Sequence, residues 1–342
     1  MAGPARSNRR ILLAKRPAGI PEPSDFSQDE VPVGEPGEGQ LLVRNIYLSV
    51  DPAQRGWASD ATNYADPVPI GGVMRALGVG QVVRSRHPDF AEGSHVYGWL
   101  GWQEYAVITP AEVLTRWGAP ELPLSNYGGL LGINGLTAHI AFHRLGRPET
   151  GETVLVSTAA GAVGSLVGQL AKAAGCRTIG LTGSDDKVAL CRERFGYDDA
   201  INYRSDDLAG ALQAAAPGGF DIFFDSAGGS ILDTGIRQMR GAGRVIQCGT
   251  ASIPAWSPPP EGLRNEREML TRRLTWSGFV IFDHIDRFGE TIAALTSLAK
   301  AGKIAFDEDI RSGIEAAPQA LADLYAGRNR GKTLIALGGD GV

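Results

Sequence analysis

The stretch STAAGAVGSLVGQLAKAAG, residues 157–175, contains no charged residue before Lys172 and follows the strand-like segment TVLVST. Its apolar residues recur at helical spacing, with small residues at the expected start of the helix. Ala159, Gly161 and Gly164 have the G-x-G-x-x-G spacing, with Ala in the first position. Such a turn lets a pyrophosphate approach free backbone N–H groups at the positive end of a helix. Small residues also suit ordinary packing of a helix on a strand, so the stretch alone leaves both interpretations open.

The segments that follow favour the binding interpretation, because strands and helices alternate in them. We expect strands at residues 178–183, 220–228 and 244–250, and a helix at 185–196. This alternation predicts βαβ units and a parallel sheet. A long loop at residues 253–266 interrupts the alternation, since three consecutive prolines exclude a helix or a central strand.

The first 125 residues have a different pattern, with short β-branched segments bounded by Gly, Pro or Asp. We expect strands at 40–50, 78–85 and 104–109, which together predict a small, irregular, barrel-like domain. The elements expected after the long loop are a strand at 274–282, a helix ending at Lys300, a strand-like segment at 306–310, a helix ending at Tyr325 and a closing strand at 332–337.

Length and composition exclude several classes of protein. A chain of 342 residues predicts two domains, and 43% hydrophobic with 21% charged residues is typical of globular proteins. The net charge of −5 gives no support for binding to nucleic acid or to a membrane surface. Cys176, Cys191 and Cys248 form no CxxC pair, which disfavours a disulfide framework. With no apolar core of a signal peptide and no apolar run that could span a bilayer, we expect a cytoplasmic protein.

The end of the second expected strand of the parallel sheet, LTGSDDK, bears on the choice of dinucleotide. NAD sites usually place an acidic residue there to bind the ribose 2′-hydroxyl. Here Gly183 lies in a small neutral turn and Lys187 follows in the next helix, which suits a 2′-phosphate. Asp185 and Asp186 would lie in the first turn of that helix, where carboxylates are favourable. We therefore predict NADP(H) in preference to NAD(H).

The sequence shows no pattern of ligands for a catalytic zinc ion. The five histidines, His87, His95, His139, His143 and His284, have no metal-ligand spacing with the cysteines. His139 and His143 fall on one side of an expected helix, but without a third ligand they are more simply a surface or packing pair. No serine nucleophile elbow is present either. The sequence predicts an enzyme that binds no metal and uses the hydride of a nicotinamide cofactor.

Further motifs run along nearly the whole chain: IYLSVDPAQRG (46–56), GWQEYAVI (101–108), GLLGINGLTAHIAF (129–142), AAGAVGSLVGQLAK (159–172), GSDDKV (183–188), FDIFFDSAGG (220–229), GFVIF (278–282) and GRNRGKTLIAL (327–337). As a set they resemble the zinc-independent medium-chain dehydrogenase/reductases, and most closely the branch of prostaglandin, plant alkenal double-bond and bacterial curcumin reductases. The resemblance implies an α/β protein with a GroES-like β-rich catalytic domain, residues 1–125 completed by 304–342. A Rossmann domain with a doubly wound parallel sheet, residues 126–303, would bind NADP(H).

The resemblance also implies an activity and a set of site residues. The activity is NADPH-dependent reduction of the C=C bond of α,β-unsaturated aldehydes and ketones, in a homodimer. The implied cofactor residues are Pro52 beside the nicotinamide; Ala160, Gly161, Ala162, Val163 and Gly164 around the pyrophosphate; Lys187 and Tyr203 near the 2′-phosphate; Ser226; Cys248, Gly249 and Thr250 on the adenosine or pyrophosphate side; Phe279, Val280 and Ile281 at the nicotinamide amide; and Asn329 from the tail.

The chain departs from the family pattern around the implied substrate pocket. The family motif DPYM reads DPAQ here, so a pocket tyrosine becomes Ala53, and Ser226 replaces an asparagine. The usual tyrosine in the loop after the CG pair is absent, and Trp256 in that loop would wall the pocket. We expect a roomier pocket near Ala53 than in the prostaglandin and plant enzymes.

Hydride transfer to the β-carbon of an enone moves charge to the carbonyl oxygen, which then needs a hydrogen-bond donor. Tyr64 is our candidate donor, with simple packing in a loop as an equal alternative. Two other functions stay open from the sequence. One is an NADPH quinone oxidoreductase of the same superfamily, and the other is a non-catalytic NADPH-binding protein, since two family tyrosines are missing.

Overall fold

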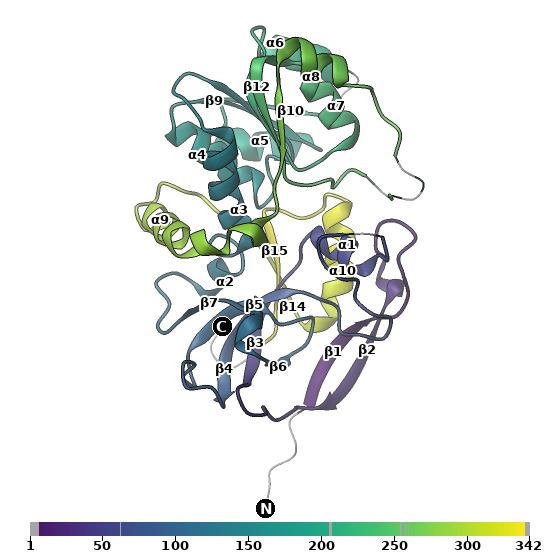
Figure 1. Ribbon diagram of the computed structural model, residues 1–342, viewed down its shortest axis with the longest axis vertical. Helices are drawn as coiled ribbons and strands as arrows, with labels where there is room; N and C mark the ends of the chain where they lie inside the picture. Colours follow the sequence, from purple (N-terminus) through teal and green to yellow (C-terminus); the bar gives the residue numbers. More distant parts are fainter. Residues whose placement is uncertain are drawn as a thin grey trace, which may run out of the picture. The chain divides into compact units, whose positions relative to one another are not determined.

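The chain folds into two units, one of which combines the beginning and the end of the sequence (Figure 1). The computed structural model describes residues 7–61, 63–204, 207–253, 255–256, 258 and 260–338. The first unit spans Met1–Gly132 and Glu308–Val342, and the second spans Ile133–Asp307. The boundaries expected from the sequence, after residues 125 and 303, lie a few residues earlier. Asn126 donates a hydrogen bond to Glu308 (2.9 Å) within the first unit, and Ala305 exchanges two hydrogen bonds with the Gln169 side chain (2.8 and 2.7 Å) within the second.

The first unit is built around an irregular sheet whose strands are mostly antiparallel. Within the described residues its order is β14-β15-β3-β4-β5-β7, β6 pairs with β3, and β1 and β2 form a separate hairpin. The strands are β1 (Ser7–Leu13), β2 (Phe26–Pro32), β3 (Leu41–Ser49), β4 (Leu77–Ser85), β5 (His95–Trp99), β6 (Tyr105–Ile108), β7 (Val113–Trp117), β14 (Glu308–Ser312) and β15 (Lys332–Ala336). The helices are α1 (Ala53–Ala58), α2 (Leu124–Tyr127) and α10 (Ala317–Tyr325).

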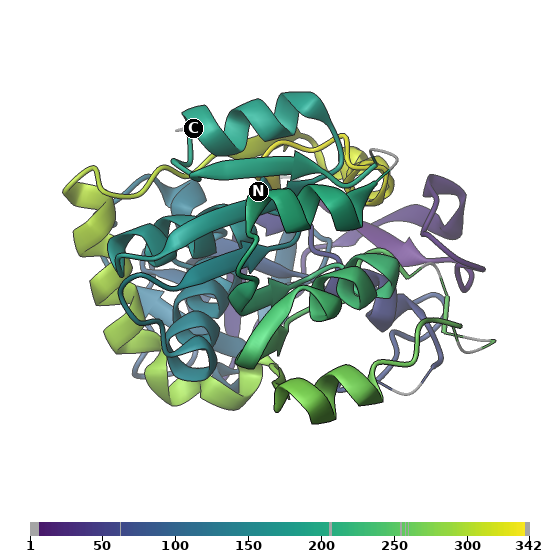
Figure 2. The ribbon, with the colours of Figure 1, turned by 90° about the horizontal axis from the view of Figure 1, so that it is seen from above.

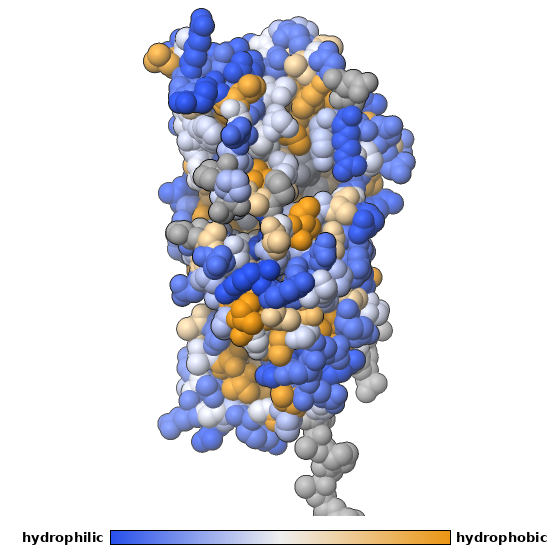
Figure 3. Space-filling model, turned by 90° about the vertical axis from the view of Figure 1, so that its right-hand side faces the viewer, coloured by the Kyte–Doolittle hydropathy of each residue, from blue (hydrophilic) through white to orange (hydrophobic). Residues whose placement is uncertain are grey.

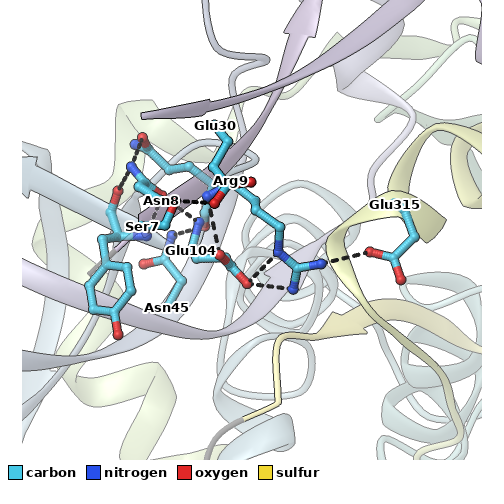
Figure 4. A network of polar contacts seen from close by, with 9 residues as sticks. Ser7, Asn8, Arg9, Glu30, Asn45, Glu104 and Glu315 are labelled. Atoms are coloured by element: carbon cyan, nitrogen blue, oxygen red, sulfur yellow. Dashed lines mark hydrogen bonds and ion pairs between the residues drawn. The ribbon is translucent and has the colours of Figure 1, made fainter. Parts of the chain in front are cut away.

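Charged side chains join the two ends of the chain within this unit. Arg9 on β1 pairs with Glu104 (2.6 Å), which precedes β6, and with Glu315 (3.6 Å), which precedes α10 (Figure 4). Asn8 accepts hydrogen bonds from the backbone of Glu104 and Tyr105 and donates one to the Tyr105 carbonyl. The C-terminal segment is therefore part of the first unit. The hydrophobic core of this unit shows the same, because it contains Trp57 and Trp102 together with residues of α10.

The second unit contains a parallel sheet with helices on both faces (Figure 2). Among the described residues its strand order is β10-β9-β8-β11-β12-β13, which is the Rossmann order 3-2-1-4-5-6. The strands are β8 (Thr153–Val156), β9 (Arg177–Thr182), β10 (Asp199–Asn202), β11 (Phe220–Asp225), β12 (Met239–Gln247) and β13 (Thr275–Gly278). The helices are α3 (Ile133–Ala141), α4 (Gly164–Ala173), α5 (Asp185–Glu193), α6 (Leu208–Ala215), α7 (Gly229–Arg237), α8 (Glu266–Arg272) and α9 (Phe288–Lys300). The predicted fold class is confirmed.

The structure differs from the expected elements where the chain turns away from the second unit's sheet. A strand is expected at 274–282, but β13 ends at Gly278 and a 3₁₀ segment, Ile281–Arg287, follows. The Phe279 N–H makes a last bond to the Gln247 carbonyl (3.1 Å), and the Phe279 ring stacks on His284 of the 3₁₀ segment, with centroids 4.8 Å apart. The sequence pattern also missed β10 and α6, which are short and weakly periodic.

Large apolar side chains that remain exposed are scattered along the chain. Figure 3 shows small groups of hydrophobic residues among hydrophilic ones on one face. The exposed residues include Ile20, Tyr64, Ile70, Trp256, Leu263, Leu270 and Trp276. Single exposed apolar residues are normal in globular proteins.

Of the helices that the structure describes, none has the length and apolar character needed to cross a bilayer.

Close packing of α4 on the second unit's sheet depends on one tyrosine and two glycines. The Tyr197 ring is buried, and its hydroxyl donates a hydrogen bond to the Gly164 carbonyl (2.6 Å). A Cβ atom on Gly168 of α4 would overlap this ring, and one on Gly180 of β9 would approach it to 3.3 Å. The ring therefore occupies the space that the two glycines leave open.

We predict that Gly168→Ala lowers the free energy of unfolding by about 1–3 kcal/mol, the usual cost of overpacking a buried site. Gly289→Ala is the matched control, because Gly289 is an exposed helical glycine of α9 with no atom near its virtual Cβ. The control should be neutral or more stable by up to about 1 kcal/mol. Urea denaturation of both variants checks this, and equal effects would show that the Tyr197 contact does not limit the position.

Candidate cofactor-binding site

The turn between β8 and α4 lies where the order of the parallel strands reverses. Rossmann folds bind dinucleotides at this switch point, beside the N-terminus of the first helix. Thr158 begins the turn with a left-handed backbone (φ 49°), which is unusual for a β-branched residue. Its carbonyl accepts a hydrogen bond from Gly161 (2.8 Å), and the Gly161 carbonyl in turn accepts one from Ser165 (2.9 Å). Strained residues of this kind concentrate at functional sites.

The small residues of the turn have different physical roles. A Cβ atom on Gly164 would overlap the Thr158 carbonyl oxygen and come within 2.9 Å of the Ala159 Cα atom, so Gly164 permits close packing of helix and strand. A Cβ atom on Gly161 would meet only Thr158, at 3.1 Å. Ala159 fits the first glycine position because it faces Gly180, whose own Cβ would lie 2.8 Å from that of Ala159. A Cβ atom would thus be far more crowded at Gly164 than at Gly161.

Cationic and aromatic residues meet at the ends of β9 and β10. Tyr203 follows β10, its N–H donates to the Thr182 carbonyl (2.9 Å), and a Cβ on Gly183 would lie 2.8 Å from its hydroxyl. Burial and the nearby charge of Arg204 lower the pKa of Lys187. Gly183, Lys187 and Tyr203, singled out in the sequence, therefore lie together, and Arg204 joins them. The sequence analysis did not single out Arg204, although it directly follows Tyr203.

Two acidic residues in the same region lie in the first turn of α5. Asp185 accepts a hydrogen bond from the Asn202 amide (2.9 Å), and Asp186 is its neighbour. This arrangement is compatible with their expected place at a helix N-terminus. The pair of cations, Lys187 and Arg204, suits a 2′-phosphate, which needs charge-assisted hydrogen bonds.

A buried carboxylate links the ends of β8, β11 and β12. Asp225 Oδ1 accepts hydrogen bonds from the Ser157 hydroxyl (2.7 Å) and the Ala227 N–H (3.2 Å). Its Oδ2 accepts from the Gly228 N–H and the Gln247 side-chain amide, both at 2.7 Å. Burial raises the pKa of Asp225, and these hydrogen bonds oppose the rise. The sequence reasoning missed Asp225 and Ser157, although polar residues at the ends of apolar strands were a visible signal.

The Gln247 side-chain amide is oriented by its hydrogen bond to the Asp225 carboxylate. Its Nε2 atom donates to both Asp225 and the Gly249 carbonyl (2.5 Å). Its Oε1 atom is buried and has no hydrogen-bond partner among the described residues. Leaving a buried acceptor unpaired costs about 1–3 kcal/mol. Two hydrogen bonds from the amide, one of them to a charged group, offset that cost.

The other predicted residues of this region lie in the loops that follow β11, β12 and β13. Ser226 and Gly249 approach closely, since a Cβ on Gly249 would lie 2.9 Å from the Ser226 carbonyl oxygen. Burial, with a contribution from the Asp225 charge, raises the pKa of Cys248 to about 12, so its thiol is not a reactive nucleophile. Phe279, Val280 and Ile281 follow the end of β13, and Ile281 is buried.

The remaining predicted residues, apart from Tyr64, lie in other segments of the chain. Pro52, Ala53 and Asn329 belong to the first unit, and Trp256 belongs to the second. Pro52 and Ala53 form the turn into α1, and the Pro52 carbonyl accepts a hydrogen bond from the Tyr325 hydroxyl (2.7 Å). Asn329 is buried, and its amide donates to the Gly331 carbonyl (3.0 Å). Trp256, in the long loop of the second unit, is 51% exposed.

Tyr64 is 53% exposed in the first unit. It lies near Tyr325. Burial raises the pKa of Tyr325, the charge of Arg55 opposes this rise, and Tyr64 adds to it. The Arg55 guanidinium also lies 5.6 Å from the centroid of the Tyr325 ring. The structure thus brings Tyr64 to the same side of the first unit as Pro52, by way of Tyr325.

A buried ion pair that the sequence reasoning missed holds the residue before Pro52. The Lys332 ammonium donates to Asp51 (2.7 Å), the Ser49 hydroxyl (2.6 Å) and the Val50 carbonyl (3.0 Å). Both charged side chains are almost completely buried. Burial lowers the pKa of Lys332, and the Asp51 charge opposes this shift. All three ammonium protons have an acceptor, which is the condition for burying a lysine.

His139 and His143 are neighbours, with ring centroids 4.7 Å apart. Burial lowers the pKa of both rings, and the charge of His143 contributes to the shift at His139. In the part of the chain that the structure describes, no group of three or more His, Cys, Asp or Glu residues has the arrangement of a metal site.

Two family profiles match the chain. One, described as the N-terminal domain of oxidoreductase, matches residues 9–115, and the other, described as zinc-binding dehydrogenase, matches residues 162–300. The chain is 38% identical to an NADP(+)-dependent 2-alkenal reductase of Nicotiana tabacum, over 96% of this chain and 97% of the relative. It is also 38% identical to an NADPH-dependent curcumin reductase of Escherichia coli, over 97% and 98% of the two chains.

Solved structures show the same relationship. The crystal structure of CurA from Vibrio vulnificus in complex with NADPH superimposes with a TM-score of 0.92 at 36% identity, covering 97% of this chain and 99% of CurA. A quinone oxidoreductase of Escherichia coli, solved with NADPH, has a TM-score of 0.80 but only 19% identity over 96% and 100% of the chains, and so shares the fold. The chain belongs to the medium-chain dehydrogenase/reductase family, in the branch that contains the alkenal, curcumin and prostaglandin reductases.

Proposed function

We propose that this chain is an NADPH-dependent ene-reductase that reduces the C=C bond of α,β-unsaturated ketones and aldehydes. The observation that carries the proposal is the carboxyl edge of the parallel sheet in the second unit, which has the small-residue turn at Gly161 and the neighbouring cations Lys187 and Arg204. These residues fit the pyrophosphate and the 2′-phosphate of NADPH. The relatives that share nearly the whole chain carry reductase names, including 2-alkenal and curcumin reductase.

The two units would have separate tasks. The second unit would bind NADPH through the turn at 160–164, Gly183, Lys187, Tyr203 and the loops after β11, β12 and β13. The first unit would be the catalytic domain and contribute Pro52, Ala53, Tyr64 and Asn329. The proposal includes a cytoplasmic location and a homodimer, and sedimentation analysis of the purified chain tests the latter.

NADPH supplies the hydride for the β-carbon of the enone when it is bound. Tyr64 would donate a hydrogen bond to the carbonyl oxygen, on which negative charge develops as the β-carbon is reduced. Its partial exposure supports this assignment. Ala53 leaves more space beside Pro52 than the tyrosine usual at this position, so bulky enones would be accepted.

The direct test measures NADPH oxidation by the purified chain with a panel of 2-alkenones and 2-alkenals, and with quinones. Faster turnover of the enones supports the proposal. Faster turnover of quinones would make the chain a quinone reductase, and NADPH binding without any turnover would make it a binding protein.

Lys187→Ala should raise the Kd for NADPH by tenfold or more, since about 1.5–3 kcal/mol is typical of a hydrogen bond to a charged group. NADH binding should change little, because NADH lacks the 2′-phosphate. Lys303→Ala, at an exposed lysine of the same unit, is the control. Fluorescence titration with both nucleotides checks the ratio, and a parallel loss for NADH would contradict a phosphate-binding role.

Gly161→Ala and Gly164→Ala should separate ligand binding from packing. Gly161→Ala should weaken NADPH binding while the free energy of unfolding changes by less than about 1 kcal/mol, because its Cβ meets only Thr158. Gly164→Ala should lower that free energy by about 1–3 kcal/mol, because its Cβ overlaps backbone. NADPH titration and urea denaturation of both variants check this. Equal NADPH affinity of Gly161→Ala and the parent would remove Gly161 from the site.

Tyr64→Phe keeps the ring and removes the hydroxyl. An interaction made mainly in the transition state affects kcat more than KM. We expect kcat on a 2-alkenone to fall by about 10- to 100-fold at unchanged NADPH affinity, since loss of one such donor typically costs about 10²-fold or more and a ribose hydroxyl can share the role. Steady-state kinetics with the parent and Tyr64→Phe measure this. A kcat equal to that of the parent would assign the donor to another group.

A further inference from the structure

Three polar side chains at the carboxyl edge of the second unit's sheet have no role in the steps described above. Ser157 follows β8, Asp225 ends β11 and Gln247 ends β12. We propose that Asp225 is a positioning residue which, through Ser157 and Gln247, fixes the wall that receives the nicotinamide half of NADPH. The inference rests on the proposed function, because it concerns the geometry of the same cofactor site.

The Asp225 carboxylate sets the direction of the loop after β11. Its two oxygens accept four hydrogen bonds, two from side chains and two from the N–H groups of Ala227 and Gly228. The Ser157 hydroxyl also accepts a hydrogen bond from the Ser226 N–H (2.8 Å). The N–H groups of three successive residues therefore point into the protein. This turn needs the left-handed backbone of Gly228 (φ 72°).

With the N–H groups of this loop turned inward, its carbonyl groups bind the loop that follows β12. The Ser226 carbonyl accepts from Ala251 (3.1 Å), and the Ala227 carbonyl accepts from Ser252 (2.8 Å). The Ser252 hydroxyl donates to the Gly228 carbonyl (3.1 Å). The Cys248 N–H donates to the Asp225 carbonyl (2.7 Å). Residues 226–228 and 248–252 are thereby paired into one wall, and both sides of it depend on Asp225.

The place of this wall in the sheet indicates which half of the cofactor it serves. The sheet consists of two mononucleotide-binding halves, β8–β9–β10 and β11–β12–β13, that meet between β8 and β11. Lys187 and Arg204 lie in the first half, where the 2′-phosphate of the adenosine moiety would bind. The wall lies in the second half, so it would face the nicotinamide ribose. The resemblance instead implied the adenosine or pyrophosphate side for Cys248, Gly249 and Thr250.

Two ligands distinguish these assignments. NADPH contacts both halves of the site, whereas 2′,5′-ADP carries only the adenosine half with its 2′-phosphate. Ser157→Ala removes one donor to Asp225 and the hydroxyl that accepts the Ser226 N–H, with a small change in volume. Asp225→Asn keeps the shape but removes the charge, and it presents an amide donor where the carboxylate accepts from donors.

We expect each variant to raise the Kd for NADPH by about tenfold, the factor typical of losing a hydrogen bond to a charged group. The Kd for 2′,5′-ADP should stay within about twofold of the parent value, since the first half of the sheet keeps its contacts. Calorimetric titration with both ligands measures the ratio. Thermal unfolding of each variant shows that the titrated protein is folded, and Ser157→Ala keeps the test available if Asp225→Asn does not fold.

Thr178→Val is the matched control. Thr178 is a buried residue at the amino end of β9, and its hydroxyl donates to the Asp198 carboxylate (3.1 Å). This variant also removes a hydroxyl that binds a carboxylate, but at the opposite edge of the sheet, so the ratio of the two Kd values should not change. Any of three results would overturn the inference. They are an equal rise of the Kd values for NADPH and 2′,5′-ADP, an unchanged Kd for NADPH, and a change in the ratio of the two Kd values in Thr178→Val equal to that in the test variants. A parent chain that binds 2′,5′-ADP and NADPH but reduces no enone would contradict the proposed function and leave the inference standing. A parent that binds neither ligand would overturn both.

Discussion

The buried carboxylate of Asp225 is the contact on which the cofactor edge of the second unit depends. A charge inside a protein is tolerated only when hydrogen bonds replace its hydration. Here four donors do so: the Ser157 hydroxyl after β8, the Gln247 amide at the end of β12, and the N–H groups of Ala227 and Gly228 in the loop after β11. The carboxylate thus links the ends of β8, β11 and β12. It also explains why the apolar strand β8 is followed by a buried serine.

A second constraint is the close approach of α4 to the sheet below it. Glycines in this region can serve helix packing or ligand binding, and the contacts that a Cβ atom would make differ among them. A Cβ atom on Gly164 would overlap backbone and one on Gly168 would overlap the Tyr197 ring, whereas one on Gly161 would come no closer than 3.1 Å to the Thr158 carbonyl oxygen. The spacing typical of dinucleotide sites therefore contains glycines that let the helix pack closely and one glycine, Gly161, where packing is less restrictive. The left-handed Thr158 belongs to this turn, because its carbonyl receives the Gly161 N–H.

In the first unit the C-terminal segment is an internal part of the fold. Lys332 is buried against Asp51, Ser49 and Val50, and Tyr325 binds the Pro52 carbonyl. The turn that carries Pro52 and Ala53 is therefore held from two sides by residues more than 270 positions later in the chain. The family motif at this turn retains its Asp-Pro pair, which the buried lysine requires, and varies at Ala53, which takes no part in these hydrogen bonds.

Local sequence patterns determined a large part of this protein. The periodicity of residues 157–175 and the strands around it predicted the Rossmann fold, and Gly183 and Lys187 pointed to one corner of it, because turn chemistry and helical spacing depend on near neighbours in the chain. Tyr203 at the same corner came from the family resemblance. The tertiary structure alone decided the partners of Asp225 and Lys332 and the addition of Arg204 to the Lys187 cluster. It also decided that β13 ends at Gly278 and that Gly164 serves packing. Each of these depends on residues brought together from distant segments, and a buried charge or a close contact is defined by those partners rather than by its neighbours in sequence.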